Sequence, residues 1–265
     1  MKQKPSFPAK VEGLSPQRPQ ATKGSLQFPV HSKNASLDSF ATHASGTGLD
    51  STKVRETMVH KLAAQGVQDE MLLRAFSVIE RHKFIDSALA NQAYEDTSLP
   101  IGFGQTISKP NVIARMIELL RQGKNLMITG KLSRVLEIGT GCGYQAALLG
   151  EVSKEVYTIE RIQGLYEKAK ENLRPMRLPN IHLILGDGML GYERGAPYSG
   201  IISAAGGEKI PSSWLNQLSV GGRLVAPVVN QKGTQILVVI DKLENGYKES
   251  FLEPVHFVPL LSGVA

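Results

Sequence analysis

The stretch Val135-Leu-Glu-Ile-Gly-Thr-Gly-Cys-Gly-Tyr-Gln145 decides the fold. Residues 135–138 are an apolar run typical of a buried strand, and they lead directly into the glycine-rich turn 139–143. A helix is predicted over 145–149. Glycines let a backbone turn sharply and approach a ligand closely, and the N-terminus of the following helix offers free N–H groups and positive potential. The stretch therefore predicts a strand–turn–helix unit that binds a nucleotide or a related cofactor.

Downstream of this turn, short apolar runs alternate with helical stretches. Strands are predicted over 156–159, 181–185, 200–203 and 224–229, and helices over 163–173 and 211–218, the second ended by Gly221-Gly222. A last pair of strands is predicted over 236–240 and 255–259, with the turn signal Asn245-Gly246 between them. This alternation indicates an α/β fold whose parallel sheet carries helices on both faces.

Upstream of the turn, the pattern is mainly helical. Helical spacing of apolar residues extends over 54–64, and Asp69 is suited to cap a second helix. Residues 84–100 are predicted to be irregular with short helix. Residues 101–110, Ile-Gly-Phe-Gly-Gln-Thr-Ile-Ser-Lys-Pro, form a predicted glycine-containing loop before an apolar helix, which Ser108 or Pro110 is suited to start.

Carboxylates stand at the carboxyl ends of the predicted strands. Glu160 lies 21 residues after Gly139, where an acidic side chain can bind both ribose hydroxyls of a cofactor. Asp187 ends the next strand and can accept from an adenine amino group, and Glu137 precedes the glycine turn. A solvated strand end is the alternative for Glu160, and a structural carboxylate is the alternative for Glu137. The spacing G-x-G-x-G, rather than G-x-G-x-x-G, favours S-adenosylmethionine over NAD.

Several further motifs resemble those of one enzyme family. They are Leu99-Pro-Ile-Gly-Phe-Gly-Gln-Thr-Ile-Ser108, the stretch 135–145, Glu160-Arg161, Gly186-Asp-Gly188, Gly221-Gly-Arg-Leu-Val-Ala-Pro227 and Phe257-Val-Pro-Leu260. Through them the chain, from about Val54 onward, resembles the protein-L-isoaspartate O-methyltransferases. The resemblance implies a Rossmann-like class I S-adenosylmethionine-dependent methyltransferase fold. Its sheet would be doubly wound, seven-stranded and mostly parallel, preceded by an N-terminal helical segment.

The resemblance also implies an activity and the residues that carry it. The family transfers a methyl group from S-adenosylmethionine to the free carboxylate of L-isoaspartyl residues in damaged proteins, which initiates their repair. Ser108 matches the family's active-site serine, and Gln105, Thr106 and Ile107 belong to the same substrate loop. Cofactor binding is expected from Glu137, Gly139, Gly141, Gly143, Glu160, Asp187 and Gly188. A plain helix N-cap is the structural alternative for Ser108.

Such a reaction needs few catalytic groups. A carboxylate is already ionised at neutral pH, so the acceptor needs no strong general base. The histidines show no ligand spacing, and the single cysteine excludes an internal disulfide and a thiolate-rich metal site. We therefore expect no metal.

Composition limits the other possibilities. The 265 residues are 42% hydrophobic, enough for a buried core, and no apolar run approaches the ~20 residues of a membrane span. Half of the net charge of +6 lies in residues 1–50, and the rest of the chain is near neutral without a run of like charges, so no nucleic-acid partner is expected. Residues 1–50 hold five of the 14 prolines and are predicted to be a disordered, basic, Pro/Ser-rich tail.

The remaining residues, 51–265, are predicted to form the methyltransferase domain. Its part 51–133 would carry the helices and the substrate loop, and its part 134–265 the cofactor-binding sheet. We expect a cytoplasmic monomer whose partners are isoaspartyl-containing peptides and proteins, without membrane contact. Two alternatives stay open: an NAD-dependent oxidoreductase, and a ligand-sensing or RNA-associated module that keeps the cofactor pocket. A nucleic-acid methyltransferase is a lesser variant, since the sequence has no Asn-Pro-Pro-aromatic run.

Overall fold

The computed structural model describes residues 52–124, 126 and 130–265, so the predicted tail over 1–50 lies outside the described residues. The helices are α1 (Thr52–Ala64), α2 (Glu70–Val78), α3 (Pro110–Arg121), α5 (Tyr144–Val152), α6 (Gln163–Leu173) and α7 (Ser212–Gln217). The strands are β1 (Leu99–Gly102), β2 (Gln105–Ile107), β3 (Leu132–Ile138), β4 (Ser153–Glu160), β5 (Ile181–Leu185), β6 (Tyr198–Ser203), β7 (Leu218–Val229), β8 (Gln235–Leu243) and β9 (Gly246–Pro254).

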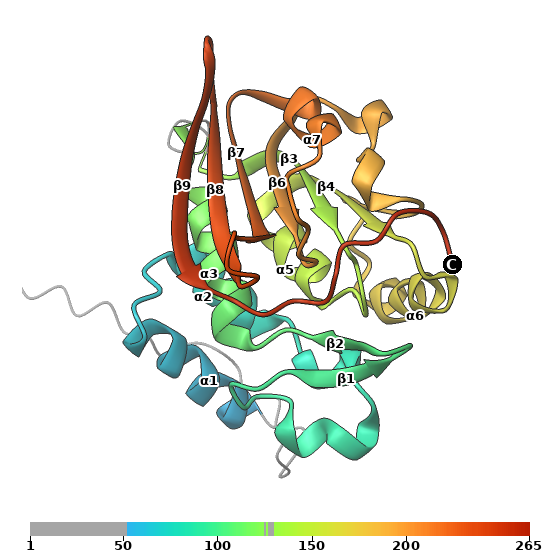
Figure 1. The fold of residues 1–265 in the computed structure, drawn as a ribbon. Coiled ribbons are helices and arrows are strands. Elements are labelled where there is room, and N and C mark those ends of the chain that lie inside the picture. Colours follow the sequence, from blue (N-terminus) through green and yellow to red (C-terminus); the bar gives the residue numbers. More distant parts are fainter. Residues whose placement is uncertain (1–51, 125, 127–129) are drawn as a thin grey trace, which may run out of the picture. The chain divides into compact units, whose positions relative to one another are not determined.

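Seven of these strands form one sheet in the order β5-β4-β3-β6-β7-β8-β9 (Figure 1). The pairs from β5 to β7 are parallel, and β8 and β9 add to the edge as an antiparallel hairpin. The chain proceeds outward from β3 to β5 and then returns to place β6 on the other side of β3. Ligands of open α/β sheets bind where the strand order reverses in this way, at the carboxyl ends of the strands. The glycine turn after β3 lies at this point.

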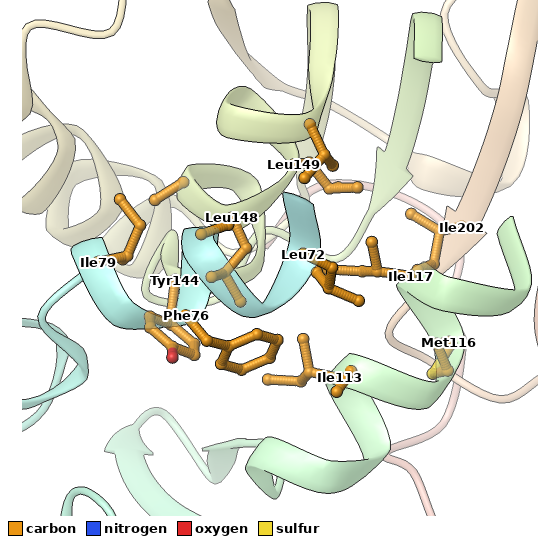
Figure 2. Packing of buried hydrophobic residues seen from close by; sticks show 14 of the residues in the cluster. Leu72, Phe76, Ile79, Ile113, Met116, Ile117, Tyr144, Leu148, Leu149 and Ile202 are labelled. Carbon is orange, nitrogen blue, oxygen red and sulfur yellow. The ribbon is translucent and has the colours of Figure 1, made fainter. Parts of the chain in front are cut away.

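Alternating side chains along the central strands supply two hydrophobic cores. On one face, Val135, Val156 and Ile202 pack with the helices α2, α3 and α5. Figure 2 shows this packing, with Leu72 and Phe76 of α2 facing Ile113 and Ile117 of α3, and Leu148 of α5 beside them. On the other face, the following residues pack around Trp214 of α7: Leu136, Ile201, Leu224 and Val238. The sheet is therefore covered on both faces, as the strand–helix alternation predicts.

Local signals explain where the first helices begin. The Asp69 carboxylate accepts a hydrogen bond from the Leu72 N–H at 2.9 Å, which confirms its predicted role as the cap of α2. Helix α3 begins at Pro110, and Lys109 precedes it without a side-chain cap. The Asp96 carboxylate instead accepts from the Asn111 N–H at 3.0 Å. The N-cap interpretation of Ser108 is therefore wrong, because an acidic residue from the preceding segment supplies the cap.

Four predictions about the bounds of strands and helices need correction. The last strand covers Gly246–Pro254 instead of 255–259, so it begins immediately after the turn at Asn245. Gly221-Gly222 does not end helix α7, since β7 begins at Leu218 and both glycines lie inside that strand. The loop predicted over 101–110 contains the β1–β2 hairpin, in which Leu99 pairs with Ile107. The cofactor-binding sheet also begins at Leu132, slightly earlier than the predicted 134.

Candidate active site

A pocket lies at the carboxyl ends of β3, β4 and β6, between the glycine turn, the β1–β2 hairpin and the segment after β9. Eight of the predicted site residues line it: Gln105, Thr106, Ile107, Ser108, Gly139, Gly141, Glu160 and Gly188. The remaining predicted residues, Glu137, Gly143 and Asp187, do not line this pocket. The structure thus brings the substrate loop and the cofactor turn to one place, although 31 positions separate Ser108 from Gly139 in the sequence.

The glycine turn adopts backbone conformations that residues with a side chain disfavour. Gly139, Gly141 and Gly143 have φ angles of +87°, +57° and +92°. Position 143 favours glycine for a further reason, because a Cβ there would lie 3.1 Å from Leu173 of α6. Gly143 therefore serves the close packing of the turn against α6, while Gly139 and Gly141 border the pocket.

Glu160 ends β4 and places its carboxylate against this turn. Its side chain is buried with the residue 4% exposed, and its two oxygens accept from the Gly141 N–H at 2.8 Å and the Ile162 N–H at 2.9 Å. Each oxygen keeps a lone pair beyond these bonds. The carboxylate therefore supports the turn and still presents acceptors and a negative charge to the pocket.

Glu137 lies beneath the turn, fully buried at the end of β3. Its Oε2 accepts from the Thr158 hydroxyl at 2.6 Å, and Thr140 and Thr158 share a further bond at 2.6 Å. Burial raises the pKa of Glu137 to about 8, a rise that the hydrogen bond from Thr158 and the nearby Gln145 side chain only partly oppose. Its burial beneath the turn therefore supports a structural role for the Glu137 carboxylate, the alternative that the sequence left open.

Asp187 lies two residues after the end of β5, and both of its carboxylate oxygens accept hydrogen bonds. Oδ1 caps the short 3₁₀ turn Gly188–Leu190 by accepting from the Met189 N–H at 2.8 Å, and Oδ2 accepts from the Gly263 N–H at 2.7 Å. The second bond comes from the segment 258–265, which crosses the ends of β4 and β5 (Figure 1). Arg161 holds the same segment by donating to the carbonyls of Ser262 and Gly263. Spacing in the sequence could not reveal this contact, because 76 positions separate Asp187 from its partner.

The β1–β2 hairpin crosses from α3 to α6 and carries Ser108 at its end. Lys168 of α6 donates to the Ile101 carbonyl at 2.8 Å, and the Phe103 ring lies so close to α6 that a Cβ on Gly164 would be 2.1 Å from it. The Ser108 hydroxyl makes no hydrogen bond with any described residue, and it borders the pocket half-buried. This hydroxyl is therefore available to a ligand.

A second hollow adjoins the pocket on the outer side of the hairpin. Both hollows are bordered by Thr106, Ser108, Ala204 and Val258. The outer hollow is also lined by Asp96, Lys109, His256 and Phe257. One chamber thus lies on the glycine turn and a second lies beside it, lined in part by residues 254–258, with Ser108 at their boundary.

Sequence reasoning missed part of the pocket. Its remaining lining includes Ile101, Cys142, Tyr144, Arg161 and the run Val258–Leu261. All of these lie in or beside the motifs on which the resemblance rests, but those motifs did not single them out as pocket residues. Among the described residues no cluster of three His, Cys, Asp or Glu side chains could hold a metal, and no helix in that part of the chain has the length and apolar character needed to cross a membrane.

Comparison with known proteins decides the family. The family model of protein-L-isoaspartate(D-aspartate) O-methyltransferases matches residues 53–265. The chain belongs to this family. A protein-L-isoaspartate O-methyltransferase of Methylibium petroleiphilum is 50% identical over 98% of this chain and 96% of its own length. Another, of Leptothrix cholodnii, is 55% identical over 83% of this chain and 77% of its own length.

Solved structures of the family share the fold. A protein-L-isoaspartate O-methyltransferase superposes with a TM-score of 0.70 at 27% identity, over 77% of this chain and 65% of that one. A Plasmodium falciparum protein assigned to the same family, in complex with S-adenosyl-L-homocysteine, superposes with a TM-score of 0.64 at 25% identity over 78% and 98%. The Rossmann-like class I methyltransferase fold and the dependence on S-adenosylmethionine follow from this membership.

The residues of the pocket fit such a cofactor. S-adenosylmethionine carries a positive sulfur and an ammonium group, and the buried Glu160 carboxylate supplies negative charge beside the turn. Arg161 also lines the pocket, but its positively charged guanidinium donates to the carbonyls of Ser262 and Gly263. Apolar side chains suited to an adenine ring complete this side of the pocket: Ile138, Ile159, Ile162 and Leu165.

Proposed function

We propose that this chain methylates the free carboxylate of L-isoaspartyl residues in peptides and proteins, with Ser108 and Glu160 in separate roles. The activity is that of the family to which the chain belongs. The observation that carries the assignment of residues is that one pocket is bordered by Glu160 and the glycine turn on one side and by the Ser108 end of the hairpin on the other.

On the cofactor side, Glu160 would accept from the ribose hydroxyls, and Gly139 and Gly141 would let the backbone approach the methionine part. S-adenosylmethionine supplies an electrophilic methyl group on a positively charged sulfur. Gly188 borders the same pocket, and any larger side chain there would meet Ile138. Asp187 would act mainly through the segment 258–265 that it anchors, since it does not line the pocket itself.

On the acceptor side, the outer hollow would receive the peptide, and the isoaspartyl carboxylate would lie at the boundary between the two hollows. There the Ser108 hydroxyl would donate to one carboxylate oxygen and leave the other free to attack. Thr106, Gln105 and Ile107 come from the same hairpin and would border the acceptor. Orientation is the main contribution that the chain makes, because an ionised carboxylate needs no base.

The test compares an isoaspartyl peptide with its aspartyl twin, each incubated with enzyme and methyl-labelled S-adenosylmethionine. We expect base-labile label in the isoaspartyl peptide and background in the twin. Equal labelling of both peptides, or of neither, would contradict the proposal. We further propose that the enzyme acts as a monomer, since described residues of one chain line the pocket. We also propose that it acts in the cytoplasm, without nucleic-acid or membrane partners.

A further inference from the structure

Gln235, the first residue of β8, binds the backbone of Phe257 at both of its polar groups. Its Nε2 donates to the Phe257 carbonyl at 3.0 Å, and its Oε1 accepts from the Phe257 N–H at 2.7 Å. These bonds join positions 22 residues apart. The side-chain amide thus replaces the partner strand that this stretch lacks, because β9 ends at Pro254.

The surroundings hold the Gln235 amide in this position. Its own carbonyl accepts from the Val255 N–H at 2.9 Å, and a Cβ on Gly206 would lie 2.6 Å from its Nε2. Gly206 also pairs with the same segment, because its N–H donates to the Val258 carbonyl and its carbonyl accepts from the Leu260 N–H, both at 2.8 Å. Gln235 and Gly206 therefore hold consecutive parts of one extended stretch.

That stretch, the wall segment Phe257–Leu261, borders both hollows of the site. Phe257 and Val258 line the outer hollow, and Val258 to Leu261 line the pocket on the glycine turn. Gln235 itself lines neither. The outer part of the wall segment, at Phe257, depends on the Gln235 amide, whereas the inner part from Val258 to Leu260 is held by Gly206.

We propose that Gln235 is a positioning residue for the acceptor peptide, which acts by fixing the wall segment beside Ser108. This inference rests on the function proposed above. Loss of the amide frees the Phe257 end of the wall segment and widens the outer hollow. Cofactor contacts farther along the segment keep their Gly206 anchor. The effect of a substitution therefore falls on the peptide more than on the cofactor.

The experiment uses Gln235→Met, which keeps the side-chain length and removes both hydrogen bonds, with Gln231→Met as the matched control. Gln231 is exposed and makes no hydrogen bond with the described residues. Kinetics with an isoaspartyl peptide, the Kd of S-adenosylhomocysteine and the thermal midpoint are measured for each. We expect kcat/KM of Gln235→Met to fall about tenfold, mainly through the KM of the peptide. The Kd of S-adenosylhomocysteine should change less than about threefold, and Gln231→Met should match the unmodified enzyme.

Gln235→Glu supplies a second test in which the side chain keeps its size. The carboxylate can accept from the Phe257 N–H but cannot donate to the Phe257 carbonyl. We expect its peptide KM to rise as well. A peptide KM within twofold of the unmodified enzyme in both folded variants would overturn the inference, and so would failure of both variants to fold, which would assign Gln235 to stability. Absence of methyl transfer in the unmodified enzyme would instead contradict the proposed function.

Discussion

Replacing Glu160 by Gln tests the cofactor side of the site. Glu160 is 4% exposed, and its carboxylate accepts from two backbone N–H groups, at 2.8 and 2.9 Å. The amide keeps the size but loses the charge, and its NH₂ group must face one of the two N–H donors. A hydrogen bond to a charged group contributes roughly 1.5–3 kcal/mol, against about 1 kcal/mol for a neutral one. The difference of roughly 0.5–2 kcal/mol for each of the two ribose hydroxyls sums to about 1–4 kcal/mol, which corresponds to an affinity at least about fivefold weaker.

The assay is isothermal titration calorimetry with S-adenosylhomocysteine. The matched control is Glu155→Gln on the same strand, where the exposed carboxylate pairs with Arg134 at 2.9 Å and is worth at most about 1 kcal/mol. We expect the control to bind like the unmodified enzyme. An affinity of Glu160→Gln within twofold of the control would refute the assignment of Glu160 to the cofactor.

Three further predictions concern separate parts of the site. Ser108→Ala should lower kcat/KM for an isoaspartyl peptide by about 10- to 100-fold, for the loss of roughly 1–3 kcal/mol of hydrogen bonding, with S-adenosylhomocysteine affinity unchanged; equal kinetics would remove Ser108 from the acceptor site. Burial raises the pKa of Glu137 to about 8, above its ordinary 4.5, so the native state holds a proton that the unfolded chain releases between these values. The contribution of this carboxyl to stability therefore falls as the pH rises, and Glu137→Gln should gain stability relative to the unmodified enzyme from pH 5 to pH 8 in urea unfolding; a constant difference would contradict this pKa. Gly188→Ala should destabilise the fold by about 1–3 kcal/mol, because the new Cβ would lie 2.6 Å from Cγ2 of the buried Ile138, and an unchanged urea midpoint would contradict the crowding.

The sequence predicts the parallel half of the sheet well, because its strands and helices carry strong local signals. Helix α6 and strand β5 have the predicted bounds of 163–173 and 181–185. The edge strand β9 differs from its predicted position because most of its side chains are exposed, so its sequence lacks an apolar alternation. The β1–β2 hairpin was missed for a related reason, since its short strands contain glycine and end in a left-handed turn at Phe103.

In the candidate site, too, the sequence predicts what local patterns encode and misses contacts between distant segments. Glu160 and the glycine turn could be placed from spacing, since strand ends of a parallel sheet meet at one edge. The contacts of Asp187 with Gly263 and of Gln235 with Phe257 depend on how distant segments pack, and no local pattern encodes them. The burial of Glu137 also follows only from the assembled sheet.

The central claim is that one chamber holds the methyl donor against the glycine turn and presents its sulfur side to Ser108. A crystal structure with S-adenosylhomocysteine tests this most directly. We predict ribose hydroxyls on Glu160 and a sulfur atom that faces the boundary between the two hollows, next to the Ser108 hydroxyl. A bound molecule whose sulfur points away from the hairpin, or a glycine turn without ligand density at saturating concentration, would contradict the account.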